Sequence, residues 1–241
     1  YYRDEYGYWR YKDASGKDLT GPQTIDGVKV YFNPGGVQVK GNFGWDGHYY
    51  DKDSGALVTN KFVEEYGRTY YVDENGNKAI GSKEINGAWN YFDKHGELIT
   101  NNFAPDGRYY DKYGKQVDFG RNRYFELNGE WYYAGNDGAI LKGPQTIDGV
   151  KVYFHQNGIQ AKGYFVKDEE DNKSRYYDKD TGALVTNQYV IAYNPYKHRI
   201  ERYYVNDQGI RLTGPQTIDG KQVYFDTYEG SQVFDNFADD G

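Results

Sequence analysis

The strongest constraint on this chain is its internal repetition. Three strings recur, with GPQTIDG beginning at Gly21, Gly143 and Gly214, GALVTN at Gly55 and Gly182, and GVKVYF at Gly27 and Gly149. A shorter unit underlies them and carries one marker tyrosine about every 20 residues: Tyr11, Tyr31, Tyr49, Tyr71, Tyr91, Tyr109, Tyr133, Tyr153, Tyr176, Tyr204 and Tyr224. Such a period is typical of repeat architectures, in which each unit contacts only its neighbours.

The turn chemistry predicts that each unit is a β-hairpin. Val28–Phe32 alternates apolar and polar residues, Asn33–Gly36 is a turn sequence, and Val37–Lys40 alternates again. A second kind of turn, Asn-Gly or Asp-Gly, suits the positive φ angles of type I′ turns. It occurs at Asp26-Gly27, Asp46-Gly47, Asn86-Gly87, Asp106-Gly107, Asn128-Gly129, Asp148-Gly149 and Asp219-Gly220.

The composition indicates how these hairpins are held together. The chain has 29 Tyr, 12 Phe and 4 Trp among 241 residues, and its 31 Gly leave no window for a helix of ordinary length. A lone hairpin is only marginally stable, so the units must stack. We therefore predict an all-β repeat protein, a solenoid of stacked β-hairpins of about 20 residues each. We expect residues 1–241 to form a single binding domain of about eleven units.

Two stretches interrupt the rhythm, and the chain starts and stops within a repeat. Lys167–Ser174 is a charge run that we expect to be a solvated loop tip, and Ile191–Glu201 lengthens one hairpin. No signal peptide is recognisable at the start, and we expect the sequence to be a piece of a longer protein.

Charge and residue usage exclude several functions. The net charge of −7 argues against a nucleic-acid partner, and no apolar run approaches a membrane span. Without Cys there is no disulfide, Cys-ligated metal site or thiol nucleophile. Most Asp residues stand in turn sequences, and the segments at Asp51–Asp53 and Asp178–Asp180 do not complete a calcium loop. We predict no catalytic residue, metal or cofactor, and a monomeric fragment.

The alternating strips suggest a binding face. If one face of each strand is buried, the inward residues are Val28, Val30, Phe32, Val37 and Val39, and the outward residues are Lys29, Tyr31, Gln38 and Lys40. The second copy of the strip leaves Lys151, Tyr153, Gln160 and Lys162 outward. A flat ring beside an amide and an ammonium suits a sugar, because a pyranose has C–H faces for stacking and hydroxyls that donate and accept.

Two longer segments carry a family resemblance. TGPQTIDGVKVYFNPGGVQVKGNF and KGPQTIDGVKVYFHQNGIQAKGYF resemble the repeats in the glucan-binding domain of bacterial glucansucrases, the extracellular glucosyltransferases that polymerise glucose from sucrose. The resemblance implies hairpin repeats that hold α-glucan, such as dextran or isomalto-oligosaccharides, in shallow pockets. It also implies a secreted or bacterial cell-surface location, with this fragment C-terminal to or flanking the enzyme.

Carried over residue by residue, the resemblance implies two full glucan-binding sites and a third, weaker one. The first comprises Tyr31, Gln38 and Lys40, and the second comprises Tyr153, Gln160 and Lys162. The third lies around Tyr224 and Gln232, where Phe234 stands in place of Lys. Other units replace the Gln-x-Lys pair, for example with Leu57 and Thr59.

Two alternatives remain open. A choline-binding or toxin-type cell-wall module would need an aromatic cage around a quaternary ammonium, and a structural spacer would need no ligand. Trp9, Trp45, Trp89 and Trp131 could be sugar platforms or staples between hairpins, and we expect staples.

Overall fold

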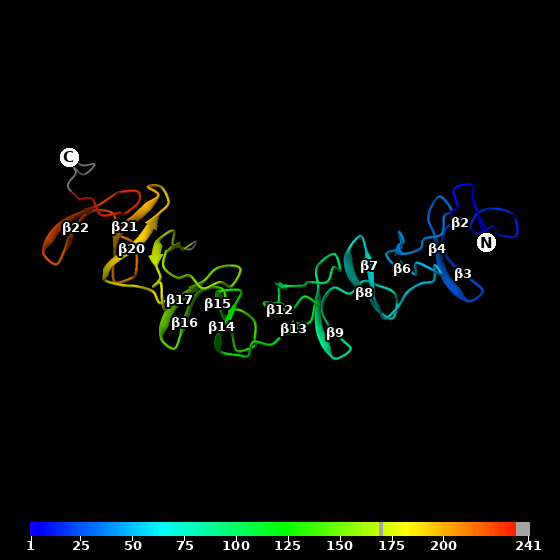
Figure 1. Cartoon of the computed structure of the whole chain (residues 1–241), viewed down its shortest axis with the longest axis horizontal. Helices are drawn as coiled ribbons and strands as arrows, with labels where there is room; N and C mark the ends of the chain where they lie inside the picture. The colour runs from blue at the N-terminus through cyan, green and yellow to red at the C-terminus, as the bar shows by residue number, and fades with distance from the viewer. Residues whose placement is uncertain (169–170, 235–241) are drawn as a thin grey trace. The chain divides into compact units, whose positions relative to one another are not determined.

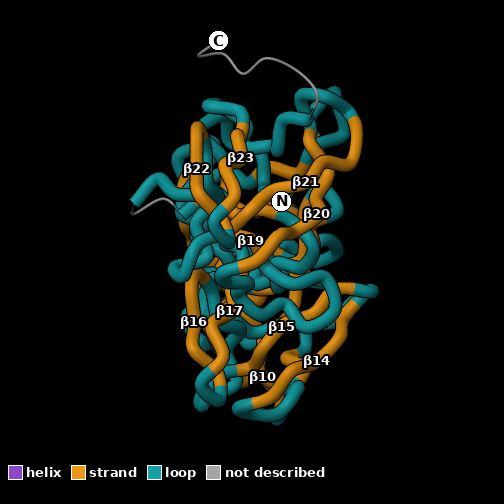
Figure 2. The backbone as a smooth tube through the Cα atoms, turned by 90° about the vertical axis from the view of Figure 1, so that its left-hand side faces the viewer, coloured by secondary structure: helices purple, strands orange, loops and turns teal. Residues whose placement is uncertain are grey.

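The computed structural model describes residues 1–168 and 171–234, and in these ranges it contains strands and turns but no helix (Figures 1 and 2). The chain divides into two compact units, Tyr1–Asp118 and Phe119–Gly241, which are described separately below. The predicted all-β fold built from short hairpins is confirmed. Whether residues 1–241 act as a single binding domain stays a prediction.

The strands pair antiparallel with their sequence neighbours. The first unit contains β1 (Tyr2–Arg3), β2 (Trp9–Arg10), β3 (Gly21–Ile25), β4 (Val28–Phe32), β5 (Asn42–Phe43), β6 (Tyr49–Tyr50), β7 (Lys61–Glu65), β8 (Arg68–Val72), β9 (Gly81–Ile85), β10 (Ala88–Phe92), β11 (Asn102–Phe103), β12 (Tyr109–Tyr110) and β13 (Gln116–Val117). All form two-stranded hairpins except β11, β12 and β13, which form a three-stranded sheet. The second unit contains β14 (Arg123–Leu127), β15 (Glu130–Ala134), β16 (Gly143–Ile147), β17 (Val150–Phe154), β18 (Phe165–Lys167), β19 (Ser174–Tyr176), β20 (Gln188–Asn194), β21 (Arg199–Val205), β22 (Gly214–Ile218) and β23 (Lys221–Phe225).

The Asp-Gly turn, rather than the Asn33–Gly36 turn, closes the main hairpin. Strand β4 pairs with β3 in the register Ile25↔Val28, and the two-residue loop has φ angles of 52° at Asp26 and 79° at Gly27, as a type I′ turn requires. The expectation that Val37–Lys40 forms the partner strand is wrong, since only Gln38 of this strip makes an isolated bridge, to Phe32. Asp46-Gly47 and Asp106-Gly107 also differ from type I′, because in them only the glycine has a positive φ.

The short segment after a hairpin, such as Val37–Lys40, is called the strip here, and it bonds both its own hairpin and the preceding one. The Gln38 backbone N–H donates to the Trp9 carbonyl at 2.8 Å, and the Gln160 N–H donates to the Trp131 carbonyl at 2.8 Å. The same connection is made by Leu57 to Lys29, Leu98 to Thr69, Leu184 to Lys151, Arg211 to Ser174 and Gln232 to Arg202. These bonds stack consecutive hairpins into a solenoid within each unit.

We call the residue that makes the isolated bridge to its own hairpin the bridge residue of that repeat. Its side chain lies against a glycine in the turn of the following repeat. The pairs are Asp18/Gly36, Gln38/Gly55, Leu57/Gly76, Lys78/Gly96, Leu98/Gly114, Ile140/Gly158, Gln160/Gly182, Leu184/Gly209 and Arg211/Gly230. The repeat thus holds a position where polar, charged and apolar side chains all meet the same backbone surface.

Burial does not follow the predicted alternation. Val30, Tyr31 and Phe32 are all buried, whereas Val28 is 45% exposed beside the turn. The expectations that Tyr31 and Gln38 point outward and that Val28 points inward are therefore wrong. Adjacent hairpins cover both faces of the strand near the stack, so consecutive residues are buried there, while the hairpin tip extends past its neighbours. The Tyr31 ring stacks on Tyr50 of the next hairpin, with 5.7 Å between ring centroids.

The core is correspondingly divided into small clusters along each unit. Ile25, Val30 and Phe32 form one cluster with Tyr11 and Leu19 packed against it. The equivalent cluster in the second unit contains Ile147, Val152 and Phe154, with Tyr124, Tyr133 and Leu141 against it. Rings and aliphatic side chains of neighbouring hairpins supply each cluster jointly, so an isolated hairpin would leave its apolar surface in water.

Both irregular stretches map onto the second unit. The stretch Ile191–Glu201 lies in the hairpin of β20 and β21, whose strands have seven residues each, and confirms the predicted lengthening. Strand β18 ends at Lys167 and β19 begins at Ser174, so the charge run connects two strands, although residues 169–170 lie outside the described part. Within residues 1–168 and 171–234, the chain has no helix with the length and apolar character needed to cross a bilayer.

Candidate functional site

A surface hollow of about 370 Å³ lies beside Trp131 in the second unit. Strand β15 supplies Trp131, and the strip that follows β17 supplies Gln160 and Lys162. The hollow is lined by Gly129, Glu130, Trp131, His155, Asn157, Ile159, Gln160, Lys162 and Tyr164. Trp131 is 39% exposed, so part of its indole surface is open to a ligand.

The amide and ammonium groups of this hollow are held by the loop of the next hairpin. Gln160 is 5% exposed and its Nε2 donates to the Thr181 carbonyl at 3.2 Å. Lys162 Nζ donates to the Asp180 carbonyl at 3.0 Å and lies 5.2 Å from the centroid of the Trp131 ring. Because these bonds fix both side chains beside the indole, the hollow is organised before any ligand enters.

A second aromatic group borders the same hollow. The His155 and Tyr164 rings stack with 5.8 Å between centroids, and His155 Nε2 and the Tyr164 hydroxyl are 2.7 Å apart. Burial raises the pKa of Tyr164, so its hydroxyl keeps its proton at neutral pH. The hollow therefore offers aromatic surface together with groups that donate and accept hydrogen bonds.

The first unit contains a similar arrangement around Trp9, with different neighbouring side chains. Lys40 Nζ lies 5.7 Å from the Trp9 ring centroid and donates to the Asp53 carbonyl at 2.8 Å. Gln38 is 7% exposed, and its Nε2 is buried with no hydrogen-bond partner among the described residues. The strand partner of Trp9 is Arg3, whose guanidinium carbon lies 4.7 Å from the Trp9 ring centroid. The strand partner of Trp131 is Glu126.

The structure brings together the predicted Gln-x-Lys pairs but gives them a different aromatic neighbour. Tyr31 and Tyr153 point into the stack, where Tyr153 packs with Ala161, Val166, Tyr177 and Leu184. The ring next to each pair is a tryptophan, Trp9 or Trp131, and whether these residues are sugar platforms or staples stays a prediction. The sequence does hold a signal: Trp9 lies 29 positions before Gln38, and Trp131 lies 29 positions before Gln160.

The third predicted site is less open. Tyr224 and Gln232 are both partly buried, and the Gln232 Oε1 is buried without a hydrogen-bond partner among the described residues. Its backbone N–H donates to the Arg202 carbonyl at 2.7 Å, as the bridge residues of the other two sites do to Trp9 and Trp131.

The aspartates have mainly turn roles, as their sequence context predicts. The Asp51 carboxylate accepts hydrogen bonds from the backbone N–H groups of Asp53 and Ser54, and the Ser54 bond lowers the pKa of Asp51. Asp178 does the same with Asp180 and Thr181, and the Thr181 N–H lowers the pKa of Asp178. In the described ranges no three His, Asp or Glu side chains are placed to share a metal ion.

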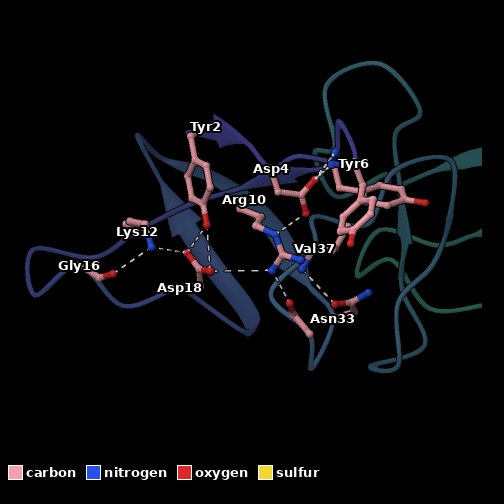
Figure 3. Close-up of polar contacts among 11 residues, drawn as sticks. Tyr2, Asp4, Tyr6, Arg10, Lys12, Gly16, Asp18, Asn33 and Val37 are labelled. Atoms are coloured by element: carbon pink, nitrogen blue, oxygen red, sulfur yellow. Dashed lines mark hydrogen bonds and ion pairs between the residues drawn. The ribbon is translucent and has the colours of Figure 1, made fainter.

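The first bridge residue shows what a carboxylate does at this position. The Tyr2 hydroxyl donates to Asp18 at 2.8 Å, and Lys12 Nζ donates to the same carboxylate at 3.2 Å (Figure 3). Arg10 Nε donates to Asp4 at 2.7 Å (Figure 3). Its Nη1 donates to the Gly35 carbonyl of the following turn at 2.5 Å. Hydrogen bonding to Tyr2 lowers the pKa of Asp18. This cluster satisfies its own polar groups and ties the first hairpin to the next turn.

Comparison with known proteins places these repeats in context. The model of the choline-binding repeat matches residues 19–62 and 141–189, and that of a cell wall binding repeat matches residues 122–140. Glucosyltransferase-I of Streptococcus mutans is 37% identical over 98% of this chain, and Glucosyltransferase-S of the same species is 32% identical over 98%. The predicted resemblance to glucosyltransferase repeats is confirmed. The chain spans 16% of the length of each of these relatives and 20% of Glucosyltransferase-I of Streptococcus downei, to which it is 28% identical.

The chain therefore matches only a part of the length of these glucosyltransferases. Among solved structures, choline binding protein F of Streptococcus pneumoniae aligns over 98% of this chain and 93% of its own, with a TM-score of 0.53 and 23% identity. This likeness shows the shared hairpin-repeat fold. Together the comparisons support a carbohydrate- or cell-wall-binding module.

Proposed function

We propose that this chain is a non-catalytic module that binds α-glucan, such as dextran or isomalto-oligosaccharides, in the hollow beside Trp131. The observation that carries the proposal is the half-open indole of Trp131 with the Lys162 ammonium 5.2 Å from its centroid and the Gln160 amide in the same hollow. The similarity to glucosyltransferases supports a glucan as the ligand.

The chemistry of the hollow fits an uncharged ring with many hydroxyls. The C–H face of a pyranose lies against the indole, while Lys162 donates to sugar oxygens and the Gln160 amide can donate and accept. A pre-bonded amide and ammonium lose little side-chain freedom when the sugar binds. One sugar in a shallow hollow nevertheless gains little net free energy, because water competes for each hydrogen bond.

Several weak sites on one chain favour a polymer over a short sugar. Trp9 with Gln38 and Lys40 provides the second site, and the surroundings of Tyr224 and Gln232 provide a third, weaker one. A glucan that reaches two sites binds the second at a high effective concentration. Dextran should therefore bind much more tightly than isomaltose.

The proposed setting is a larger, secreted glucosyltransferase. There the module would hold the polymer, α-(1→6)- or α-(1→3)-linked, near the enzyme that makes it, outside the cell or at its surface. The relatives' names and the cell wall binding repeat at residues 122–140 support this setting.

Affinity electrophoresis in gels with and without dextran tests the proposal. We expect the chain to be retarded by dextran, and Trp131→Ala to lose part of this retardation. Trp89→Ala is the matched control, because Trp89 is 49% exposed and does not line the hollow. A parallel gel with choline tests the cell-wall alternative. Unchanged mobility in dextran would remove the glucan proposal, and equal loss in both variants would remove the Trp131 site.

A further inference from the structure

A different bridge residue, Lys78, occupies an aromatic corner in the first unit. Its Nζ lies 3.8 Å from the ring centroid of Phe43 and 4.3 Å from that of Tyr70. The two rings stand nearly perpendicular, at 77°, with 5.2 Å between their centroids. Phe43 comes from the preceding hairpin and Tyr70 from the same hairpin as Lys78. Among the described residues, no carboxylate lies within ion-pair distance of this ammonium.

The same arrangement recurs in the second unit with arginine. Phe165 and Tyr203 meet at 70° with 5.0 Å between centroids, and the Arg211 guanidinium carbon lies 5.4 Å from the Phe165 centroid. Arg211 follows Tyr203 by eight positions, as Lys78 follows Tyr70. At the equivalent place after Tyr132 the bridge residue is Ile140, which is 7% exposed.

Two perpendicular ring faces around one cation are the arrangement by which proteins recognise alkylated ammonium groups. Here the chain itself supplies the cation. One ring of each corner, Phe43 or Phe165, lies inside the segments that match the choline-binding repeat, whereas Tyr70, Tyr203 and the two cations lie outside them. Each corner thus has the perpendicular ring pair that suits an ammonium group, and a cationic side chain from the following strip lies against it.

We propose that the Phe43–Tyr70 corner is an ammonium-binding site that Lys78 closes in cis. The Lys78 ammonium competes with choline for the corner at a very high effective concentration, because it belongs to the same chain. Shortening Lys78 removes this competitor and opens a site for choline or tetramethylammonium. Arg211 closes the second corner in the same way. The inference is independent of glucan binding, which uses the other bridge residues Gln38 and Gln160.

Titration calorimetry with choline chloride on the full chain tests the proposal. We expect Lys78→Ala to bind choline at least tenfold more tightly than the unmodified chain, and choline to raise its thermal midpoint by linkage. Lys78→Ile is the matched control: like Ile140, the new side chain fills the corner without charge, so choline should not bind. Dimethylbutanol, the uncharged carbon analogue of choline, should not bind Lys78→Ala either, since a cation is required.

Equal choline affinity in the unmodified chain and Lys78→Ala would overturn the proposal, as would binding to Lys78→Ile. Should Lys78→Ala fail to fold, NMR of the unmodified chain decides. Rings this close should shift the ε-methylene protons of Lys78 upfield, and Phe43→Leu should reduce the shift. Unshifted ε-methylene protons would show that the corner is not filled by Lys78. Dextran retardation, which should be unchanged in Lys78→Ile, separates this outcome from a failure of glucan binding.

Discussion

The Gln160 side chain lies directly on Gly182, the glycine in the turn of the next hairpin. A Cβ on Gly182 would come within 2.6 Å of Gln160 Cδ, and Gly182 has a φ of 71°. Gln38 has the same relation to Gly55, where a Cβ would come within 2.9 Å of Gln38 Cδ. The positions of the Gln38 and Gln160 amides therefore depend on a glycine in the following repeat.

Gly182→Ala should destabilise the second unit more than Gly149→Ala. Both glycines have positive φ angles, 71° and 79°, but a Cβ on Gly149 would meet no atom within 4 Å. The backbone penalty is then shared, and overlap with Gln160 adds a further cost of about 1–3 kcal/mol. Urea unfolding followed by tyrosine and tryptophan fluorescence measures the difference. Equal midpoints in the two variants would show that the amide moves aside freely.

Removing both Gln-x-Lys pairs should reduce dextran retention more than removing one. Gln160→Ala with Lys162→Ala leaves the first-unit site, whereas the fourfold variant with Gln38→Ala and Lys40→Ala leaves only the weaker third region. Loss of the second contact removes the effective-concentration gain, so retention should fall by about tenfold or more. Circular dichroism checks that the fold persists. Full retention by a folded fourfold variant would show that the pairs do not bind glucan.

Acid should destabilise the chain through its turn aspartates. Hydrogen bonding from the Thr181 backbone N–H lowers the pKa of Asp178 from 3.8, so the charged carboxylate stabilises the folded state. This stabilisation is present above the unfolded pKa and is lost as the pH falls through the folded pKa, that is, below about pH 4. Thermal midpoints measured from pH 7 to pH 2 should show the loss. Asp178→Asn keeps an accepting oxygen without the charge, so its curve should be flatter, and a curve parallel to the unmodified chain would contradict this origin.

Alkali should destabilise the chain through buried phenols. Burial, with a hydrogen bond to Asp106, raises the pKa of Tyr110 to about 12, and burial raises the pKa of Tyr177 to about 12. A raised pKa stabilises the fold below the unfolded value of 10.0, and that stabilisation is lost as the pH rises towards 12. Ultraviolet titration of tyrosinate should show these phenols ionising late and together with unfolding. Tyr177→Phe should move the alkaline transition to higher pH, and no shift would contradict the assignment.

The repeats and their turns could be predicted from the sequence because they rest on local chemistry. Asp26-Gly27 adopts the positive φ angles that its residue types favour, and each marker tyrosine falls in or next to a paired strand. The facing of side chains could not be predicted in this way. Alternation assumes one buried face, yet the hairpins in the stack cover both sides of Val30, Tyr31 and Phe32.

By itself, the sequence determined that this protein is a stack of hairpins about twenty residues long, because repeated glycine turns and evenly spaced rings leave no other stable arrangement. Only the tertiary structure decided which hairpin each strip joins. The backbone N–H of Gln160 donates to the Trp131 carbonyl of the preceding hairpin, so an indole, not the marker tyrosine, stands beside the Gln-x-Lys pair. This arrangement depends on hydrogen bonds and packing between successive repeats, which the sequence pattern within one repeat does not specify.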